Sequence, residues 1–429
     1  MDYDLRAQPA RATTDADGRS VPDASTERWF QAVAQGFHDA RMRPRGLDVA
    51  VRAAAADGAT LRGAYLTDPP PLDLDPHTPV ATFISFDKTL NVGGGRLLPL
   101  HMITDVTVRP THRRRGLLRQ MMTTDLTEAR DAGLPMAALT VSEGSIYGRF
   151  GFGAATWLRH ISLDTSRRFG LRDEASGRVE MVDPHACADV VRDVFERFHA
   201  RERGSVDRPS WYPEWVTGRY DPTSDEPDQR RRAAVHHDGS GTVDGYVSYR
   251  VEQDGQGPRQ LAIQDLVTAS DDAYLGLWQF LAAVDLVENV TFSRAPMEDP
   301  LEFALADPRL YSVTRLEDVI WLRVLDVVAA LEAREWVQDG SVLLGVRDAM
   351  GMAEGTFRVE VRDRRAEVTR SDREPEVVLD VTTLGSLYLG GVTVRTLRRS
   401  NRFEGTPDAL DRFARLMELP TRPYCVTRY

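Results

Sequence analysis

The sequence of 429 residues contains only two cysteines, Cys187 and Cys425, which give neither a disulfide framework nor the ligand spacing of a zinc site. No run approaches the roughly 18 apolar residues that a membrane span needs. Residues 1–4 do not begin a basic region followed by an apolar stretch, as a signal peptide would. We therefore expect a soluble cytoplasmic protein with no metal cofactor and no membrane partner.

The charge balance is acidic. A net charge of −11 argues against a general nucleic-acid binder and suits a cationic substrate. The hydrophobic fraction of 42% is ample for packed cores, and the length predicts about two to four domains.

The segment from Val106 to Leu118 carries the clearest chemical signal. A strand-like alternation ends at Pro110, and Gly116 begins an amphipathic helix. The free N–H groups and positive dipole of a helix start suit a phosphate, and arginines on the approach add positive charge. The segment therefore predicts a pyrophosphate site. Its predicted contacts are Val106, Thr107, Val108, Arg114, Arg115, Gly116, Leu117, Leu118 and Arg119.

The glycines of this loop fit neither the Gly-x-Gly-x-x-Gly motif nor the P-loop, since no Gly-Lys-Ser/Thr follows. The pattern Arg113-x-x-Gly116-x-Leu118 resembles the coenzyme A loop of the GNAT acetyltransferases, although a small residue usually stands in place of Leu118. A solvated basic turn is the alternative for the loop alone. The triple glycine at 93–95 lies between two strand-like runs, at 80–86 and 96–103, and indicates a hairpin turn.

A second motif follows the predicted strand at 136–141. The run 147–152, Tyr-Gly-Arg-Phe-Gly-Phe, is similar to the Tyr-x-Lys/Arg-x-Gly-Phe found in GNAT enzymes. Ser142 and Glu143 complete the predicted cofactor contacts. A phenol near the cofactor thiol would make Tyr147 a proton donor. The alternative is a short helix whose aromatic residues belong to the core.

Over most of its length the chain resembles one family, the enhanced intracellular survival (Eis) N-acetyltransferases of actinobacteria. The similar segments are 110–119, 142–151, 321–323, 329–334 and 384–390. The resemblance implies an α/β (α+β) fold with tandem GNAT domains and a sterol carrier protein-like domain. It also implies acetyl-CoA as co-substrate and a homo-oligomer, commonly a hexamer.

We predict a GNAT domain with the acetyl-CoA site at 1–164, a degenerate GNAT-like domain at 165–323 and the sterol carrier protein-like domain at 324–429. A strand at 158–163 would close the first unit, and residues 10–23 look like a polar loop before a helix capped by Ser25 or Thr26. In the second unit a strand at 260–267 precedes a helix at 274–286. Asp271 and Asp272 stand there in place of the arginines and would repel phosphate. In the third unit we expect helices at 325–334, 382–388 and 408–417 and strands at 341–346, 355–362, 365–369 and 376–379.

The end of the chain, residues 423–429, is aromatic and β-branched, which indicates a packed tail and from composition alone a final strand. The Eis resemblance implies a further role, because those enzymes end on an aromatic residue whose terminal carboxylate acts as the general base. Tyr429 occupies that position. An α-carboxyl has a pKa near ~3.5, so we expect burial to raise the pKa of this base.

The resemblance also implies the chemistry and the substrate. An amine of an aminoglycoside-like polycation would attack the thioester directly, at one or several positions, while the Val108 N–H stabilises the oxyanion. Phe37 and Asp39 resemble the aromatic and acidic pair of the family's substrate pocket. Arg428 replaces an acidic penultimate residue and would disfavour a polycation beside the base.

Three alternatives remain open at this point. The first is a protein-lysine or other small-amine acetyltransferase, and the second is a coenzyme A- or lipid-binding regulator without turnover. The third concerns His236, His237 and Asp238, which superficially suggest a metal site but lie between two strand-like runs and predict a hairpin turn. Cys425 is expected to be a packed thiol.

Overall fold

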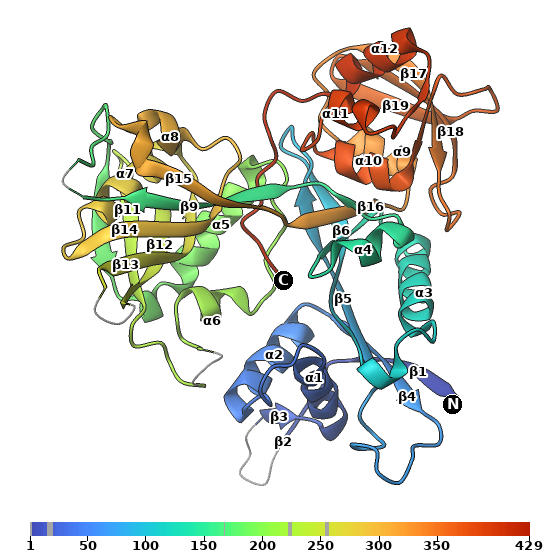
Figure 1. Ribbon diagram of the computed structural model, residues 1–429, viewed down its shortest axis with the longest axis horizontal. Coiled ribbons are helices and arrows are strands. Elements are labelled where there is room, and N and C mark those ends of the chain that lie inside the picture. Colours follow the sequence, from blue (N-terminus) through green and yellow to red (C-terminus); the bar gives the residue numbers. More distant parts are fainter. Residues whose placement is uncertain (1, 15–19, 167, 222–224, 254–256) are drawn as a thin grey trace.

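The computed structural model describes residues 2–14, 20–166, 168–221, 225–253 and 257–429. Two seven-stranded sheets and one five-stranded sheet organise three units (Figure 1). Among the described helices, none has both the length and the apolar character that crossing a bilayer requires.

The first sheet has the order β1-β4-β5-β6-β7-β16-β8. Its strands are β1 (Tyr3–Pro9), β4 (Thr60–Leu66), β5 (Ala81–Asn91), β6 (Leu97–Val108), β7 (Met136–Thr140), β8 (Gly153–Ala154) and β16 (Ile320–Val324). Its helices are α1 (Ala24–Gly36), α2 (Pro44–Ala56), α3 (Leu117–Asp131) and α4 (Gly144–Tyr147), with 3-10 turns η1 (Pro110–His112) and η2 (Gly148–Phe150). The hairpin between β5 and β6 confirms the predicted turn, in which all three glycines at 93–95 have positive φ.

The start of this unit differs from the prediction. Residues expected to form a polar loop instead include a two-stranded ribbon of β2 (Ala12–Thr14) and β3 (Ser20–Pro22), while the part of that loop at 15–19 lies outside the described residues. The cap of α1 is Asp23, whose carboxylate accepts from the Thr26 N–H at 2.7 Å. Ser25 and Thr26 therefore belong to the first turn of the helix.

The second sheet has the order β10-β11-β12-β13-β14-β9-β15. Its strands are β9 (Trp157–Asp164), β10 (Arg178–Val182), β11 (Arg232–His237), β12 (Val243–Gln253), β13 (Arg259–Thr268), β14 (Val287–Ala295) and β15 (Tyr311–Asp318). Its helices are α5 (Ala188–Arg201), α6 (Tyr212–Val216), α7 (Asp271–Ala282) and α8 (Pro300–Ala304), with turns η3 (Pro184–Ala186) and η4 (Pro308–Leu310).

The two sheets exchange strands. We expected the strand at 158–163 to close the first unit, and this was wrong, because β9 pairs with β14 and β15 of the second sheet. In its place β16, from the end of the second unit, lies between β7 and β8 of the first sheet. Thus β9 follows the strands of the first unit in sequence but belongs to the second sheet, and β16 follows those of the second unit but belongs to the first sheet. Figure 1 shows both strands crossing between the units. Alternation alone predicts that a strand exists, but not the sheet that it joins.

The third unit contains every helix and strand predicted for it, with shifts at the ends. Its sheet has the order β19-β18-β17-β20-β21. The strands are β17 (Gly340–Arg347), β18 (Gly355–Arg362), β19 (Arg365–Arg370), β20 (Val377–Asp380) and β21 (Glu404–Gly405). The helices are α9 (Val327–Ala333), α10 (Val381–Tyr388), α11 (Val394–Arg399) and α12 (Pro407–Met417).

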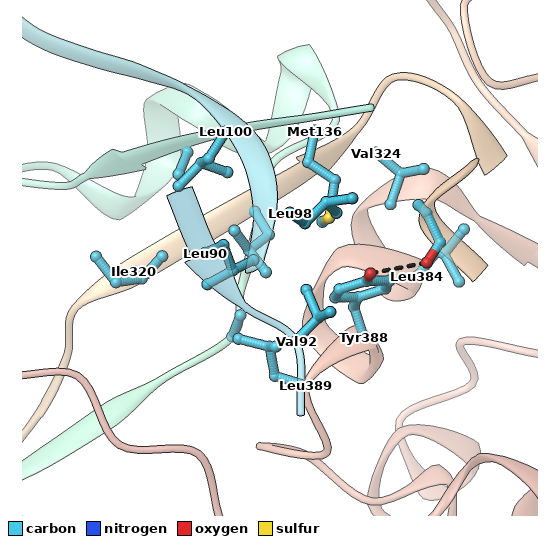
Figure 2. Close-up of a cluster of buried hydrophobic side chains, with 14 of the residues drawn as sticks. Leu90, Val92, Leu98, Leu100, Met136, Ile320, Val324, Leu384, Tyr388 and Leu389 are labelled. Atoms are coloured by element: carbon cyan, nitrogen blue, oxygen red, sulfur yellow. Dashed lines mark hydrogen bonds between the residues drawn. The ribbon is translucent and has the colours of Figure 1, made fainter. Parts of the chain in front are cut away.

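Helix α10 joins this unit to the first sheet. Leu384 and Tyr388 pack in one apolar cluster with Leu90 of β5 and Val92, which follows that strand (Figure 2). The buried Tyr388 hydroxyl donates to the Ala330 carbonyl at 2.7 Å, so its polar atom is satisfied inside the cluster. The interface is therefore a continuous core that fixes the third unit against the first sheet.

The C-terminal tail runs between the two GNAT-like sheets (Figure 1) without joining either as a strand, so the simple final-strand interpretation was wrong. Residues of the second unit hold it. The Tyr424 N–H donates to the Arg203 carbonyl at 2.9 Å, and the Arg428 N–H donates to the Tyr212 hydroxyl at 2.8 Å. Cys425 is fully buried, as expected of a packed thiol. These bonds set where the last residue lies.

A buried ionic network fixes helix α3 on the first sheet. His101 on β6 contacts Asp87 at 2.7 Å through Nδ1 and Asp125 of α3 at 2.8 Å through Nε2. Arg62 contacts the same Asp125 at 2.9 Å. Burial alone would lower the pKa of His101, but the hydrogen bonds to Asp125 and Asp87 outweigh it and raise this pKa to about 9. Between pH 6.5 and about 9, His101 is therefore charged in the folded protein and neutral in the unfolded chain.

This network predicts a pH-dependent stability. Because the folded-state pKa of His101 lies above its unfolded value of 6.5, its stabilisation is complete below pH 6.5 and is lost as the pH rises through about 9. The rise of the His101 pKa from 6.5 to about 9 corresponds to a loss on the order of 3 kcal/mol. Thermal midpoints of the native protein should fall between pH 6.5 and 9 more steeply than those of His101→Gln. Parallel curves for the two proteins would show that His101 does not titrate in this range.

Candidate active site

The site lies where β6 and β7 separate. These parallel strands pair only from Leu100↔Met136 to Ile103↔Leu139. Beyond Ile103, β6 continues to Val108, bonded to β5 alone. The side of β6 that faces β7 therefore has a free edge over its last residues, with backbone groups that can bond to a ligand.

A cavity of about 300 Å³ opens at this separation. Its walls come from β6, β7 and the residues just after it, the end of α4, the end of α1 and the C-terminus. The lining residues are Phe37, Ile103, Thr104, Asp105, Val106, Leu139, Thr140, Val141, Ser142, Tyr147 and Tyr429. The structure therefore brings together both predicted catalytic residues, two predicted cofactor contacts and one predicted substrate contact.

The terminal residue is held inside this cavity. The hydroxyl of Thr140, the last residue of β7, donates to the terminal oxygen of Tyr429 at 2.5 Å. The Tyr429 ring packs edge-on against Phe86, with centroids 6.3 Å apart. Its phenol oxygen is buried and has no hydrogen-bond partner among the described residues. The carboxylate is thus the part of this residue that is positioned by a polar contact.

Tyr147 lies at the end of α4 and is only 6% exposed. Its ring packs edge-on against Phe152, which supports the structural role that the sequence left open for this aromatic residue. Burial, and after it the negative charge of Glu143, raise the pKa of Tyr147 to about 12. The phenol therefore keeps its proton near neutral pH, as a proton donor must.

The predicted phosphate loop forms the start of α3. Gly116 is its N-cap with φ of +81° and provides no side-chain cap. The N–H groups of residues 117–119 consequently have no acceptor within the helix. Arg113, Arg114, Arg115 and Arg119 are exposed, and none forms an ion pair within the ranges that the structure describes. The Leu117 side chain is buried in the core, so only its backbone could reach a phosphate.

The equivalent helix start of the second unit is built differently. Ser270 caps α7 by accepting from the Ala273 N–H at 3.1 Å, and its hydroxyl donates to Asp244 at 2.5 Å. Asp271, in the first turn, pairs with Arg201 at 2.6 Å. This helix start is occupied by the protein's own polar groups and carries acidic charge, whereas the start of α3 carries neither.

Several predicted contacts lie outside the cavity lining. Thr107 is buried and its hydroxyl contacts the Thr82 hydroxyl at 2.7 Å, on the β5 side of β6. Val108 is the last residue of β6, beyond the lining residue Val106. Glu143 is exposed at the cap of α4. Asp39 is also exposed, just beyond α1, while its neighbour Phe37 lines the cavity and is 44% exposed.

Arg428 points to the second unit. Its guanidinium donates to Glu317 at 2.5 Å, and the same carboxylate oxygen contacts His160 at 2.7 Å. Arg428 is not among the residues that line the cavity. The ion pair offsets the positive charge that the sequence places next to the terminal base.

Asp105 is a cavity residue that the sequence analysis missed. It lies in a β-bulge, where Asp105 and Val106 of β6 stand opposite the single residue Phe83 of β5. Its φ is +52°, and the Thr82 hydroxyl donates to its carbonyl at 2.9 Å. Burial raises the pKa of Asp105 to about 6. The alternation of β6 gives no sign of the bulge, although Asp is among the residues that tolerate a positive φ.

No metal site accompanies this cavity in the part of the chain that the structure describes, where no group of three or more His, Cys, Asp or Glu side chains is arranged to hold an ion. His236 has its two ring nitrogens on Asp244 at 2.6 Å and on the Ser176 carbonyl at 2.8 Å. His236 and His237 end β11, and the chain turns at 238–242 into β12, as the hairpin prediction required.

The comparisons with known proteins agree with this fold. Residues 18–155 and residues 204–324 each match a family model described as an acetyltransferase (GNAT) domain, and residues 327–426 match a sterol carrier protein domain. An uncharacterized N-acetyltransferase of Streptomyces griseus is 34% identical over 427 residues, which cover 95% of this chain and 98% of the relative.

Two mycobacterial proteins place the chain more narrowly. The N-acetyltransferase Eis of Mycobacterium tuberculosis is 35% identical over 335 residues, which cover 75% of this chain and 79% of the relative. The crystal structure of Eis1 from Mycobacterium abscessus covers all of both chains with a TM-score of 0.81 at 28% identity. The chain has two GNAT domains followed by a sterol carrier protein domain, and three quarters of it align with Eis at 35% identity. This protein is therefore an N-acetyltransferase of the Eis family.

Proposed function

We propose that this N-acetyltransferase transfers the acetyl group of acetyl-CoA directly to amines of aminoglycoside-like polycations, at one or several positions. The observation that carries the proposal is the meeting of a proton acceptor and a proton donor in one cavity. The Tyr429 carboxylate, held by Thr140, and the Tyr147 phenol both line the cavity at the open edge of β6. A direct amine transfer is accelerated by a base that takes a proton from the amine and by an acid that protonates the departing sulfur.

The residues of the chain fit acetyl-CoA. The uncapped start of α3, with its unpaired arginines, would hold the pyrophosphate through backbone N–H groups and positive charge. Acetyl-CoA supplies the acetyl group as a thioester when it is bound. The sequence predicts that the backbone N–H of Val108 stabilises the oxyanion. The backbone N–H of Val106, also on the free part of β6, is a second candidate donor, and Val106 lines the cavity.

The two proton steps belong to Tyr429 and Tyr147, which both line the cavity. The Tyr429 carboxylate accepts a proton from the substrate ammonium, which frees the nitrogen lone pair for attack. The Tyr147 phenol holds its proton at neutral pH and can give it to the departing sulfur. Phe37, at the mouth of the cavity, would contact the apolar face of a sugar ring. Asp39 would attract a cation from the exposed rim.

Release of coenzyme A in the presence of acetyl-CoA tests the proposal. The panel of acceptors contains aminoglycosides, polyamines and lysine peptides. Turnover on aminoglycosides above that on lysine peptides supports the proposed substrate class. Preference for the peptides would instead assign the protein-lysine alternative. Tight coenzyme A binding without transfer to any acceptor would favour a regulatory role.

The cofactor loop makes a separate prediction. Replacing Arg114, Arg115 and Arg119 together with Gln removes three exposed positive charges from the start of α3 while leaving the buried side of the helix intact. We expect KM for acetyl-CoA to rise about 10-fold or more, with kcat within about twofold, because the contacts are the same in ground and transition states. The same substitution at three exposed arginines that form no ion pair among the described residues, Arg395 and Arg399 of α11 and Arg415 of α12, is the control. An unchanged KM would move the pyrophosphate to another site.

We further propose that the protein assembles as a homo-oligomer, with a hexamer as the expected state, and acts in the cytoplasm without nucleic-acid or membrane partners. Light scattering of the purified full chain gives the molecular mass of the assembly directly. A mass equal to the 48.0 kDa of one chain would contradict the oligomer.

A further inference from the structure

Asp105 is an acidic residue inside the acetyl-transfer cavity without a counter-charge from the protein. It lines the same space as Tyr147 and Tyr429. Across the described ranges its carboxylate accepts no hydrogen bond and forms no ion pair. A half-buried carboxylate that lacks such partners is costly, because burial removes part of its hydration and nothing in the protein replaces it. A partner from outside the chain would remove this cost.

The backbone holds Asp105 in this place. The bulge in β6 breaks the alternation that would otherwise set which side chains face the cavity, and the four consecutive residues 103–106 all line it. The Thr82 hydroxyl bonds both to the Asp105 carbonyl and to the Thr107 hydroxyl, at 2.9 Å and 2.7 Å. The hydrogen bond from Thr82 to the Asp105 carbonyl therefore stabilises the positive φ of Asp105. The Asp105 side chain takes no part in this contact.

The chemistry of such a group selects its ligand. Apart from Asp105, the titratable residues that line the cavity are Tyr147 and Tyr429, and neither supplies a cation. Arg428 is the nearest cation in sequence to the terminus, and it is turned to Glu317. Two carboxylates, those of Asp105 and of the terminus, thus share one cavity. An acceptor with a single amine could satisfy only one of them, whereas an acceptor with two ammonium groups satisfies both.

We infer that Asp105 is a specificity-determining residue of this site, whose carboxylate binds a second ammonium group of the acceptor while the first amine is acetylated. The inference rests on the proposed acetyl transfer in this cavity. It gives the acceptor a chemical requirement, two amino groups within reach of one small cavity, which a polycation with widely spaced charges does not meet. No bond is made or broken at Asp105, and its contribution is to KM.

Asp105→Asn is the informative variant. It removes the charge, keeps the size of the side chain, and places Asn at a positive φ that Asn tolerates as well as Asp. Calorimetric titration of the full chain in the presence of coenzyme A at pH 8 should compare cadaverine, which has two amines, with pentylamine, which has one. The native protein should bind cadaverine about 10-fold more tightly or better. In Asp105→Asn we expect the two affinities to lie within about twofold, through loss of cadaverine binding alone.

The control is Asp189→Asn on α5, which removes a carboxylate whose side chain is 85% exposed. It should leave both affinities unchanged. Equal affinities of the native protein for the two amines would overturn the inference, as would an equal loss of both in Asp105→Asn or no loss at all. A fall in kcat with unchanged KM would also overturn it, because Asp105 would then take part in proton transfer.

Acetyl transfer, measured on the same proteins, separates this inference from the proposed function. If cadaverine binds preferentially through Asp105 but neither cadaverine nor any aminoglycoside of the panel is acetylated, the proposed function fails and the Asp105 site stands. If both amines are acetylated with equal KM, the function stands and the role of Asp105 is wrong.

Discussion

One glycine added after Tyr429 is expected to lower kcat/KM for the acceptor amine by about 100-fold to 10,000-fold, the usual contribution of a general base. The addition converts the terminal carboxylate into a neutral amide and moves the charge one residue along the chain. The Thr140 hydroxyl, which donates to that terminus at 2.5 Å, would then bond to an amide carbonyl. A carbonyl in that position can accept this hydrogen bond but cannot take a proton from an ammonium. Coenzyme A release with the best acceptor of the panel measures the change.

Two variants separate the carboxylate from the rest of the terminus. Tyr429→Phe keeps the carboxylate and removes a buried phenol oxygen that has no partner among the described residues. We expect native turnover and equal or greater stability, since an unpaired buried hydroxyl costs about 1–3 kcal/mol. Thr140→Val keeps the terminal charge but loses the hydroxyl that positions it. Its kcat/KM should lie between that of the native protein and that of the extended protein. An extended protein that turns over within about twofold of the native rate would remove the terminus from the mechanism.

The local motifs were the most predictable part of this protein. A helix start is set by a few adjacent residues, so the strand, the Arg-rich turn and the Gly116 cap could be recognised without a partner segment. The same holds for the third unit, whose alternating strands and short turns are local signals. Tyr147 was also selected from a local motif, and it lines the cavity, while its role as proton donor stays a prediction.

Long-range placement was not predictable from these patterns. Strands β9 and β16 have the alternation of ordinary strands, and only tertiary packing decides that each joins the sheet of the other unit. The tail lacks regular secondary structure, and its course depends on bonds to Arg203 and Tyr212, more than 200 positions earlier in the chain. The composition of residues 423–429 could indicate burial, but the destination of Tyr429 came from the family resemblance alone.

Asp105 shows a different limit. In a regular strand the residues at 104 and 106 would share one face and Asp105 would take the other. The bulge cancels this rule, and it arises from a mismatch of one residue between β5 and β6 that neither strand shows by itself. A carboxylate in the middle of an apolar strand was the available signal, because an acidic group buried beside a cavity needs a reason.

Tyr147→Phe is the substitution with the second largest expected effect. The phenyl ring keeps the edge-on contact with Phe152, whose ring centroid lies 6.5 Å away, so the fold of α4 should not change. The hydroxyl alone is lost. We expect kcat to fall about 100-fold, with KM for acetyl-CoA within about twofold, because the proton transferred to sulfur matters only in the transition state.

The pH dependence and a matched control make the test of Tyr147 specific. Since its pKa is about 12, the native phenol stays protonated from pH 6 to pH 10, and no loss of activity in that range is expected from its ionisation. Tyr388→Phe removes another buried phenol, one that donates to Ala330 at 2.7 Å in the third unit and is not among the residues that line the cavity. It should lower stability and leave kcat unchanged. If Tyr147→Phe turned over at the native rate, the leaving sulfur would have to depart as a thiolate or take its proton from water, and Tyr147 would be a packing residue of the cavity wall.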